Sequence, residues 1–121
     1  MKKILVIEDE VHLRQLYQTE LSEDGYEVIL AKNGFEGIDL CKTENPDLVV
    51  VDIRMPGMDG LDTISRLLEH DRRRPVIIHS AYPHYQDNFM SWNADAFIVK
   101  SGDLTALKEK INSFLQPANS R

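Results

Sequence analysis

The 121-residue sequence predicts an α/β fold in which a doubly wound sheet of five parallel strands carries five helices on its two faces. Three observations support this prediction. Apolar runs of strand length recur without polar alternation, which is typical of strands covered on both faces. Segments with helical spacing of apolar residues follow the runs, and turn-forming residues mark most boundaries. Regular alternation of strand and helix favours a parallel sheet, because right-handed crossovers place each helix over one face.

The strands are expected where the apolar runs lie. The five runs cover residues 4–7, 28–31, 48–51, 76–78 and 96–99. Because these runs do not alternate with polar residues, both faces of each strand are expected to be covered. With the strand order 2-1-3-4-5 the fold is flavodoxin-like, and strands one and three adjoin where successive helices pass to opposite faces.

Turn residues bound the first two helices. Asp24-Gly25 closes the first helix, Asn33-Gly34 opens the second, and Asn45-Pro46 ends it. Helical spacing predicts that the first helix buries a face formed by Leu13, Leu16, Tyr17 and Leu21.

The later helices are less uniform. The third helix is expected to start at Leu61 with Asp59 as its N-cap. Residues 82–93 hold many poor helix formers, so a short fourth helix that ends at Asn93 is expected there. Residues 116–121 read as a loose C-terminal tail, and residues 1–121 as a single domain. The third helix is expected to bury a face formed by Leu61, Ile64 and Leu68. The corresponding face of the fifth helix is expected to comprise Leu104, Leu107, Ile111, Phe114 and Leu115.

Composition argues against several classes of function. Acidic residues outnumber basic ones by 20 to 14, and the net charge of −6 disfavours direct binding of nucleic acid or of an anionic membrane. No apolar stretch has membrane-spanning length, and the run that follows Lys3 stops at Glu8, too early for a signal peptide. The single cysteine, Cys41, cannot pair within the chain, so the expected compartment is the cytoplasm.

Polar side chains gather at the carboxyl ends of the expected strands. Glu8 and Asp9 follow the first strand, Asp52 the third, Ser80 the fourth and Lys100 the fifth. These strand ends share one edge of a parallel sheet, so the five side chains are expected to meet. Two like charges about 4 Å apart cost roughly 4 kcal/mol at an effective dielectric constant near 20. A cation is therefore expected among the acids, and carboxylates with room for water suit Mg²⁺.

These groups fit phosphoryl transfer, in which catalysis is mainly positioning and charge neutralisation. Mg²⁺ and Lys100 would neutralise the phosphoryl oxygens, Ser80 would donate to one of them, and Asp52 would carry the group as an acyl phosphate. Taken alone, Asp9 could be a helix cap and Lys100 a solvated surface lysine. Ser80 alone carries almost no information about function. The convergence of all five at one edge favours the site.

Four stretches of the sequence resemble the receiver domain of two-component response regulators of the chemotaxis-regulator type. They are residues 4–10, 47–61, 80–81 and 97–100, within a similarity that extends from Lys3 to about Leu115. The resemblance implies that Asp52 is the phosphoacceptor, that Asp9 binds Mg²⁺ directly, and that Glu8 acts partly through water.

The resemblance implies further roles around this centre. The backbone carbonyl of Arg54 would complete the metal site, and Lys100 would contact the phosphoryl group. Ser80 would supply the hydroxyl that moves toward a phosphoryl oxygen, and Phe97 the aromatic ring that turns inward behind it. That movement would alter a surface formed by the fourth helix, the fifth strand and the fifth helix. Arg54 and Tyr82, as bulky groups two residues beyond Asp52 and Ser80, are expected to tune the phosphoryl lifetime.

Three positions depart from the family pattern, and one of them, Asn93 in place of the usual glycine, is expected to disrupt little because asparagine tolerates the left-handed conformation. Ser101 follows Lys100 where family members usually have a proline with a cis bond. A non-proline cis bond costs about 2.5–4 kcal/mol, so a trans bond or a strained loop is expected. Phe97 lacks the hydroxyl of the tyrosine often found at that position, so its inward turn would be a packing event alone.

The expected function is a phosphoacceptor switch of a two-component system or phosphorelay. The chain would receive a phosphoryl group from a histidine kinase or histidine phosphotransfer protein, lose it by Mg²⁺-assisted hydrolysis, and signal to a downstream protein effector or an attached output domain. It would assist its own phosphorylation without being a conventional enzyme, and its switching face is a candidate homodimer interface. Two alternatives stay open: a Mg²⁺-dependent phosphohydrolase with an aspartyl nucleophile, and an interaction module that is never phosphorylated.

Overall fold

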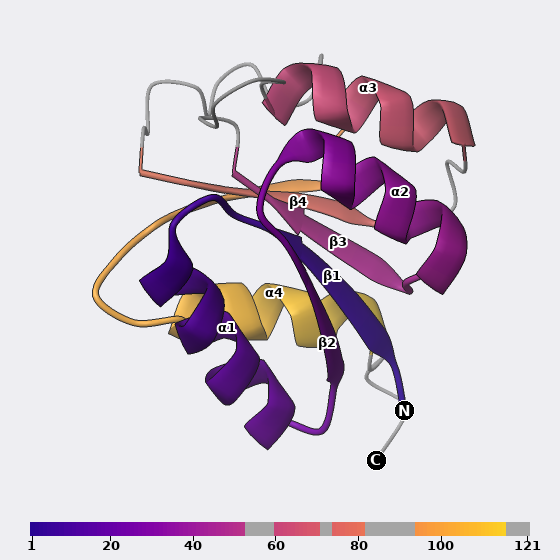
Figure 1. The fold of residues 1–121 in the computed structure, drawn as a ribbon. Helices are drawn as coiled ribbons and strands as arrows, with labels where there is room; N and C mark the ends of the chain where they lie inside the picture. The colour runs from indigo at the N-terminus through magenta and orange to yellow at the C-terminus, as the bar shows by residue number, and fades with distance from the viewer. Residues whose placement is uncertain (53–59, 71–73, 82–93, 116–121) are drawn as a thin grey trace.

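A five-stranded parallel sheet forms the centre of the computed structural model, which describes residues 1–52, 60–70, 74–81 and 94–115. The strand order β2-β1-β3-β4-β5 confirms the predicted fold class (Figure 1). The bounds of the strands are β1 Lys3–Ile7, β2 Glu27–Ala31, β3 Leu48–Val51, β4 Val76–Ser80 and β5 Ala96–Val99. β4 extends two residues beyond its apolar run, so His79 and Ser80 belong to the sheet.

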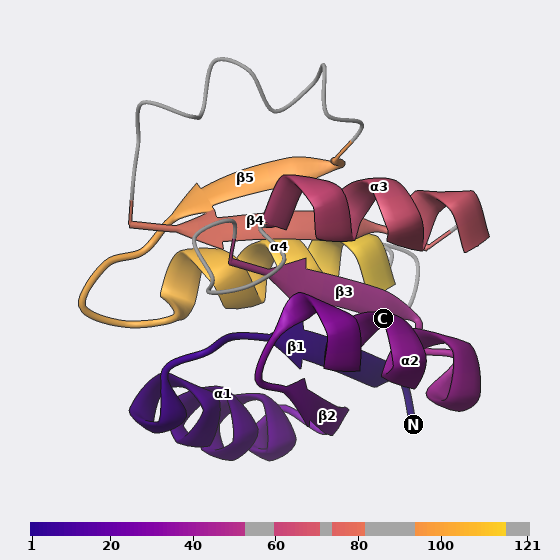
Figure 2. The ribbon, with the colours of Figure 1, turned by 45° about the horizontal axis from the view of Figure 1, so that its top comes forward.

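Helices cover both faces of this sheet. Helices α2 (Gly34–Glu44) and α3 (Gly60–His70) lie on one face, and α1 (Val11–Glu23) and α4 (Thr105–Leu115) lie on the other (Figures 1 and 2). The described residues thus contain four helices, of which α4 is the expected fifth. The helix expected within residues 82–93 lies outside the described residues, as does Asp59, the expected cap of α3.

The core consists of two apolar layers separated by the sheet. Along β1, Leu5 and Ile7 face the α2/α3 layer, whereas Ile4 and Val6 face the α1/α4 layer, and all four side chains are fully buried. This arrangement explains the continuous apolar runs, because both faces of the central strands exclude water. β2 is an edge strand, as the predicted order requires, but it is less covered than its apolar run predicts, because residues 28–30 are only partly buried.

Turn residues and caps end the helices largely as predicted. Asn33 caps α2 by accepting a hydrogen bond at Oδ1 from the Glu36 amide (2.8 Å), and Asn45 ends that helix in the left-handed conformation with φ 50°. The cap of α1 is Glu10, whose carboxylate accepts from the Leu13 amide (3.0 Å). The plainer interpretation of Asp9 as a helix cap is therefore wrong.

The predicted helix faces needed two corrections. On α1, Tyr17 and Leu21 are buried, but Leu16 is 38% exposed, because it lies about 100° around the helix from Tyr17. On α3, Ile64 is buried as predicted and Leu67, which the prediction omitted, is also buried. The face of α4 packs as predicted into the α1/α4 layer.

Gly37 in α2 packs directly against β1. A Cβ at this position would lie 2.4 Å from Cδ1 and 2.7 Å from Cγ1 of Ile7, which is fully buried and has no free space to move into. We expect Gly37→Ala to lower the free energy of unfolding by about 1–3 kcal/mol despite the better helix propensity of alanine, as measured by urea denaturation. The loss should shrink in an Ile7→Val background, which lacks Cδ1; an equal loss in both backgrounds would contradict the steric cause.

Candidate functional site

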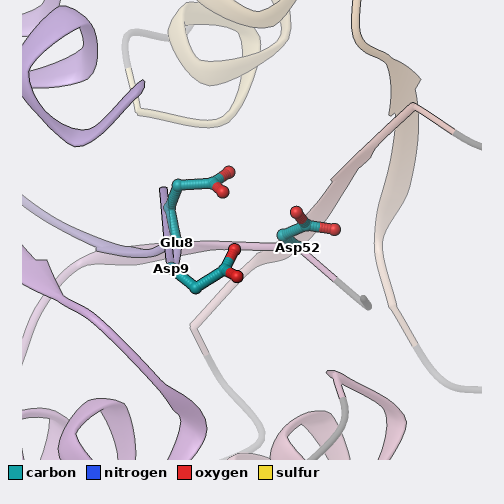
Figure 3. A group of neighbouring side chains, drawn as sticks. All are labelled: Glu8, Asp9 and Asp52. Carbon is teal, nitrogen blue, oxygen red and sulfur yellow. The ribbon is translucent and has the colours of Figure 1, made fainter. Parts of the chain in front are cut away.

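Three carboxylates meet where β1 and β3 end. Ile7 and Val51 are paired in the parallel register, and the Asp52 amide donates to the Ile7 carbonyl (3.1 Å), so the residues that follow the two strands lie side by side. One carboxylate oxygen from each of Glu8, Asp9 and Asp52 lies within 4.8 Å of the others (Figure 3). Glu8 and Asp52 are buried and Asp9 is exposed, so the cluster opens to solvent on the side of Asp9.

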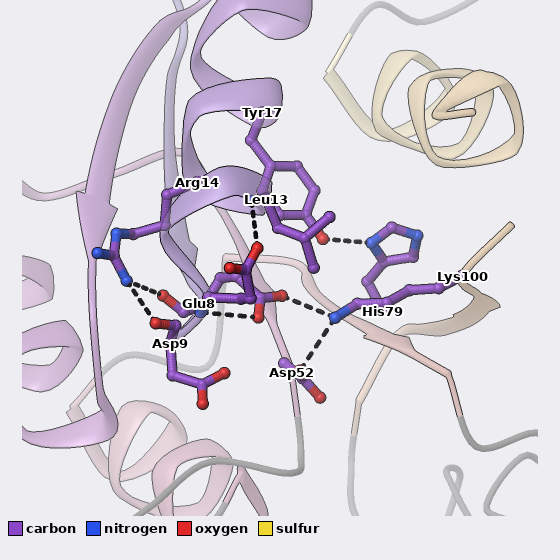
Figure 4. A network of polar contacts seen from close by, with 9 residues as sticks. Glu8, Asp9, Leu13, Arg14, Tyr17, Asp52, His79 and Lys100 are labelled. Atoms are coloured by element: carbon purple, nitrogen blue, oxygen red, sulfur yellow. Dashed lines mark hydrogen bonds and ion pairs between the residues drawn. The ribbon is translucent and has the colours of Figure 1, made fainter. Parts of the chain in front are cut away.

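Lys100, which follows the edge strand β5, contacts two of these acids. Its Nζ donates to Glu8 Oε1 (2.8 Å) and to Asp52 Oδ2 (3.0 Å) (Figure 4). Its backbone amide donates to the carbonyl of Ser80 (2.7 Å), which holds the start of the loop after β5 beside the end of β4. The Lys100–Ser101 bond is trans, as predicted, and the serine in place of proline leaves Lys100 directed into the acidic cluster.

Burial and charge act against each other in this cluster. Burial raises the pKa of Glu8, although the contact with Lys100 opposes the rise. Burial would lower the pKa of Lys100, but the hydrogen bonds and charges of Glu8 and Asp52 together outweigh it and raise that pKa. Lys100 therefore stays charged at neutral pH and offsets part of the repulsion among the acids.

Ser80 and Phe97 lie on the face of the sheet that packs against α2 and α3. Ser80 is fully buried at the end of β4, paired with Val99, and Phe97 is paired with Ile78 and is 7% exposed. The structure therefore brings the ends of β4 and β5 together beside Lys100, with the Phe97 ring turned inward. Arg54 and Tyr82, the other predicted site residues, lie outside the described residues.

Sequence reasoning missed a buried polar pair beneath the acids. The Tyr17 hydroxyl and His79 Nδ1 are 2.5 Å apart, and the two rings meet edge to face with centroids separated by 5.7 Å (Figure 4). Burial, followed by the charge of Lys100, lowers the pKa of His79 to about 4, so the imidazole is neutral at neutral pH and shares one hydrogen bond with the tyrosine hydroxyl. Burial also raises the pKa of Tyr17. Because Tyr17 has helical core spacing and His79 ends an apolar run, neither position carries a local signal of pairing.

A second missed residue, Arg14, holds the loop that carries two of the acids. Its Nη1 donates to the backbone carbonyls of Glu8 (2.8 Å) and Asp9 (2.9 Å). A basic residue in the first turn of a helix is the available sequence signal, because the helix dipole disfavours a cation there.

The donor set of the cluster fits Mg²⁺. The three ligand groups are all carboxylates, and Mg²⁺ prefers hard oxygen ligands and retains several waters, for which the exposed side at Asp9 leaves access. Lys100 supplies a second positive group beside Asp52. Such an arrangement can neutralise a phosphoryl group held next to a carboxylate nucleophile.

Comparison with known proteins identifies the family. Residues 4–112 match the family model for the response regulator receiver domain. The chain belongs to this family. Receiver domains are phosphoacceptor regulators of two-component systems and not conventional enzymes, in agreement with the function expected from the sequence.

Curated relatives support the assignment along the whole receiver domain. The chain is 37% identical to sporulation initiation phosphotransferase F of Bacillus subtilis, over 94% of each protein. It is 35% identical to the probable transcriptional regulator ycf27 of Cyanophora paradoxa, over 95% of this chain but 48% of that protein. This receiver domain thus spans about half the length of such transcriptional regulators.

Solved structures agree with the receiver-domain fold. The response regulator TrrA of Thermotoga maritima, in complex with Mg²⁺-BeF, superposes with a TM-score of 0.89 at 40% identity, covering 94% of this chain and 99% of that one. TrrA in complex with the histidine kinase ThkA gives a TM-score of 0.88 at 40% identity, covering 96% and 100%. Among the described residues, no helix has the length and apolar character needed to cross a bilayer.

Proposed function

We propose that this receiver domain accepts a phosphoryl group on Asp52 from a histidine kinase or a histidine phosphotransfer protein. The observation that carries the proposal is the contact of Lys100 with Asp52 inside a cluster whose third carboxylate, Asp9, is open to solvent. An inert interaction module would not require this set of groups. A phosphohydrolase with an aspartyl nucleophile would use similar groups, but residues 4–112 match the receiver-domain family instead. The 40% identity to TrrA, which was solved both with Mg²⁺-BeF and with a histidine kinase, supports the same donor class and metal.

The groups of the site divide the work of phosphoryl transfer. Asp9 and Asp52 would hold Mg²⁺ directly, with the backbone carbonyl of Arg54 as a further ligand. Glu8 would act through water, because its Oε1 already accepts from Lys100 and its Oε2 from the Glu10 amide. When bound, Mg²⁺ supplies positive charge to the oxygens of the transferring group.

The transfer itself uses the Asp52 carboxylate. One of its oxygens attacks the phosphorus while the phosphorus–nitrogen bond to the donor histidine breaks, which leaves an acyl phosphate on Asp52 and a neutral imidazole on the donor after protonation. Lys100 binds a phosphoryl oxygen as the new charge forms. In the later hydrolysis, a water oxygen attacks the phosphorus while the bond between the phosphorus and the Asp52 oxygen breaks, which releases inorganic phosphate and restores the Asp52 carboxylate. The domain would thereby assist its own dephosphorylation.

The signal would pass through Ser80 and Phe97. Ser80 would donate to a phosphoryl oxygen, and the movement of β4 would alter the packing of the Phe97 ring beside it. The surface formed by residues 82–93, β5 and α4 would respond to this change and would serve a downstream effector, an attached output domain or a second copy of the chain. Arg54 and Tyr82 would tune the lifetime of the acyl phosphate. Residues 1–121 would form one receiver domain that acts in the cytoplasm and does not itself bind nucleic acid.

A small-molecule phosphodonor tests the proposal without the cognate kinase. We expect incubation with phosphoramidate and Mg²⁺ to add the mass of one phosphoryl group, which hydroxylamine removes as it does other acyl phosphates, and peptide mapping to place the group on Asp52. EDTA should prevent the addition. An unchanged mass, or a stable phosphate on another residue, would overturn the assignment, and sustained hydrolysis of p-nitrophenyl phosphate would favour the phosphohydrolase.

A further inference from the structure

Arg14 is tied to the backbone of the acidic loop. The residue lies in the first turn of α1, and a single guanidinium nitrogen, Nη1, donates to the carbonyls of both Glu8 (2.8 Å) and Asp9 (2.9 Å) (Figure 4). In an extended strand, successive carbonyls point to opposite sides. Two successive carbonyls that share one donor therefore require a turn at this point, and Arg14 holds that turn closed.

The position of Arg14 is locally unfavourable for a cation. The N-terminal end of a helix carries partial positive charge, which disfavours a positive side chain in the first turn. The two carbonyl contacts offset this cost. A residue that opposes a local preference is expected where a functional site requires it.

The three acids differ in what fixes their side chains. Glu8 is held by Lys100 and by the Glu10 amide, and Asp52 is held by Lys100. Within the part of the chain that the structure describes, no hydrogen bond or ion pair is recorded for the exposed Asp9 carboxylate. Its direction therefore depends on the backbone of Asp9, whose carbonyl Arg14 binds.

We propose that Arg14 is a positioning residue for divalent-cation binding: by fixing the turn after β1, it directs the Asp9 carboxylate toward the metal. The inference rests on the proposed function, because it assigns Arg14 to the Mg²⁺ site used there. A purely electrostatic role predicts the opposite sign. By Coulomb's law alone, removing a positive charge near three carboxylates should tighten the binding of a divalent cation, whereas loss of positioning should weaken it.

Titration calorimetry with MgCl₂ separates these two signs. We expect Arg14→Met to weaken Mg²⁺ binding about tenfold or more, in the range observed when outer contacts of metal ligands are removed. Arg66→Met, which removes an exposed arginine from α3, is the matched control and should bind Mg²⁺ like the wild type. Equal or tighter binding by Arg14→Met overturns the inference.

A conservative variant covers the case in which Arg14→Met fails to fold. Arg14→Lys keeps the charge, but its side chain is one bond shorter, so its nitrogen should hold the two carbonyls less closely from the same backbone position. We expect it to bind Mg²⁺ more weakly than the wild type, and wild-type affinity in this variant would overturn the positioning role. Thermal unfolding of each variant without Mg²⁺ reports whether it is folded.

Phosphorylation by phosphoramidate at increasing Mg²⁺ provides a second readout. For Arg14→Met, the half-saturating Mg²⁺ concentration should rise about tenfold while the rate at saturating Mg²⁺ stays close to that of the wild type, because Asp52 and Lys100 are untouched. A lower maximal rate with unchanged half-saturation would overturn the inference. If the wild type itself takes up no Mg²⁺, the proposed function fails. If the wild type binds Mg²⁺ and the Arg14 variants bind it equally well, only the inference about Arg14 fails.

Discussion

Replacement of Lys100 by methionine is expected to slow phosphoryl transfer from phosphoramidate to Asp52 about 100-fold or more, the usual cost of removing one donor to a developing negative charge. Lys100 contacts Asp52 directly, with Nζ 3.0 Å from Oδ2. The measurement is the initial rate of mass addition at saturating Mg²⁺, with Asp52→Asn as the background. Lys108→Met, which removes a lysine of α4 paired with Glu20, is the matched control and should retain the wild-type rate.

The Lys100→Met variant should be less stable than the wild type without metal, but Mg²⁺ should stabilise it more. Without Lys100, the buried Glu8 carboxylate loses its 2.8 Å ion pair, so the metal-free protein should become less stable, in the direction seen when one member of a buried pair is removed. Mg²⁺ should then raise the unfolding temperature of Lys100→Met more than that of the wild type, because it meets a more negative cluster. Fast phosphorylation of the variant, or an unchanged response to Mg²⁺, would contradict the role assigned to Lys100.

Mild acid is expected to destabilise the fold through His79. Its pKa is about 4 in the native state, against 6.5 for an exposed histidine, so between these values the unfolded chain binds a proton that the native chain does not. Stability is therefore unaffected by His79 above pH 6.5 and falls as the pH decreases toward 4. The linkage amounts to about 2 kcal/mol between pH 7.5 and 5, and to about 3 kcal/mol once both states are protonated.

Urea denaturation at pH 7.5 and pH 5 measures this loss. The double variant Tyr17→Phe/His79→Val replaces both partners of the buried hydrogen bond by apolar groups, so it leaves no unsatisfied donor and should remain folded. Its stability should change far less between the two pH values than that of the wild type. His12→Ala, which removes an exposed histidine of α1, should keep the wild-type dependence. An equal loss in the double variant would show that other groups cause the acid effect.

Much of the fold and site could be predicted because their signals are local. Unbroken apolar runs identify strands covered on both faces, and the residue that follows such a run, as Asp52 follows β3, must lie at the shared edge of a parallel sheet. The convergence of Glu8, Asp9 and Asp52 thus followed from topology alone. The resemblance to a family then suggested the individual roles.

The contacts that sequence reasoning missed are long-range or depend on rotamers. Tyr17 and His79 are 62 residues apart, and each reads as part of an apolar face in its own segment. Arg14 is close to Glu8 in sequence, but the choice of backbone carbonyls as its partners depends on the turn between them. The exposure of Leu16 shows the limit of helical spacing: Leu16 lies one residue before Tyr17 and five before Leu21, and neither spacing places it on the face that these two residues share.

The attachment of Lys100 to β5 ties chemical competence to completion of the fold. Its two acidic partners follow β1 and β3, near the middle of the sheet, whereas the lysine follows an edge strand at the other end of the sequence. A nascent chain, or a copy whose outer strand has frayed, would present the acids without their lysine and would be a poor phosphoryl acceptor. Efficient phosphorylation of Asp52 would thus require that β5 is in place beside β4.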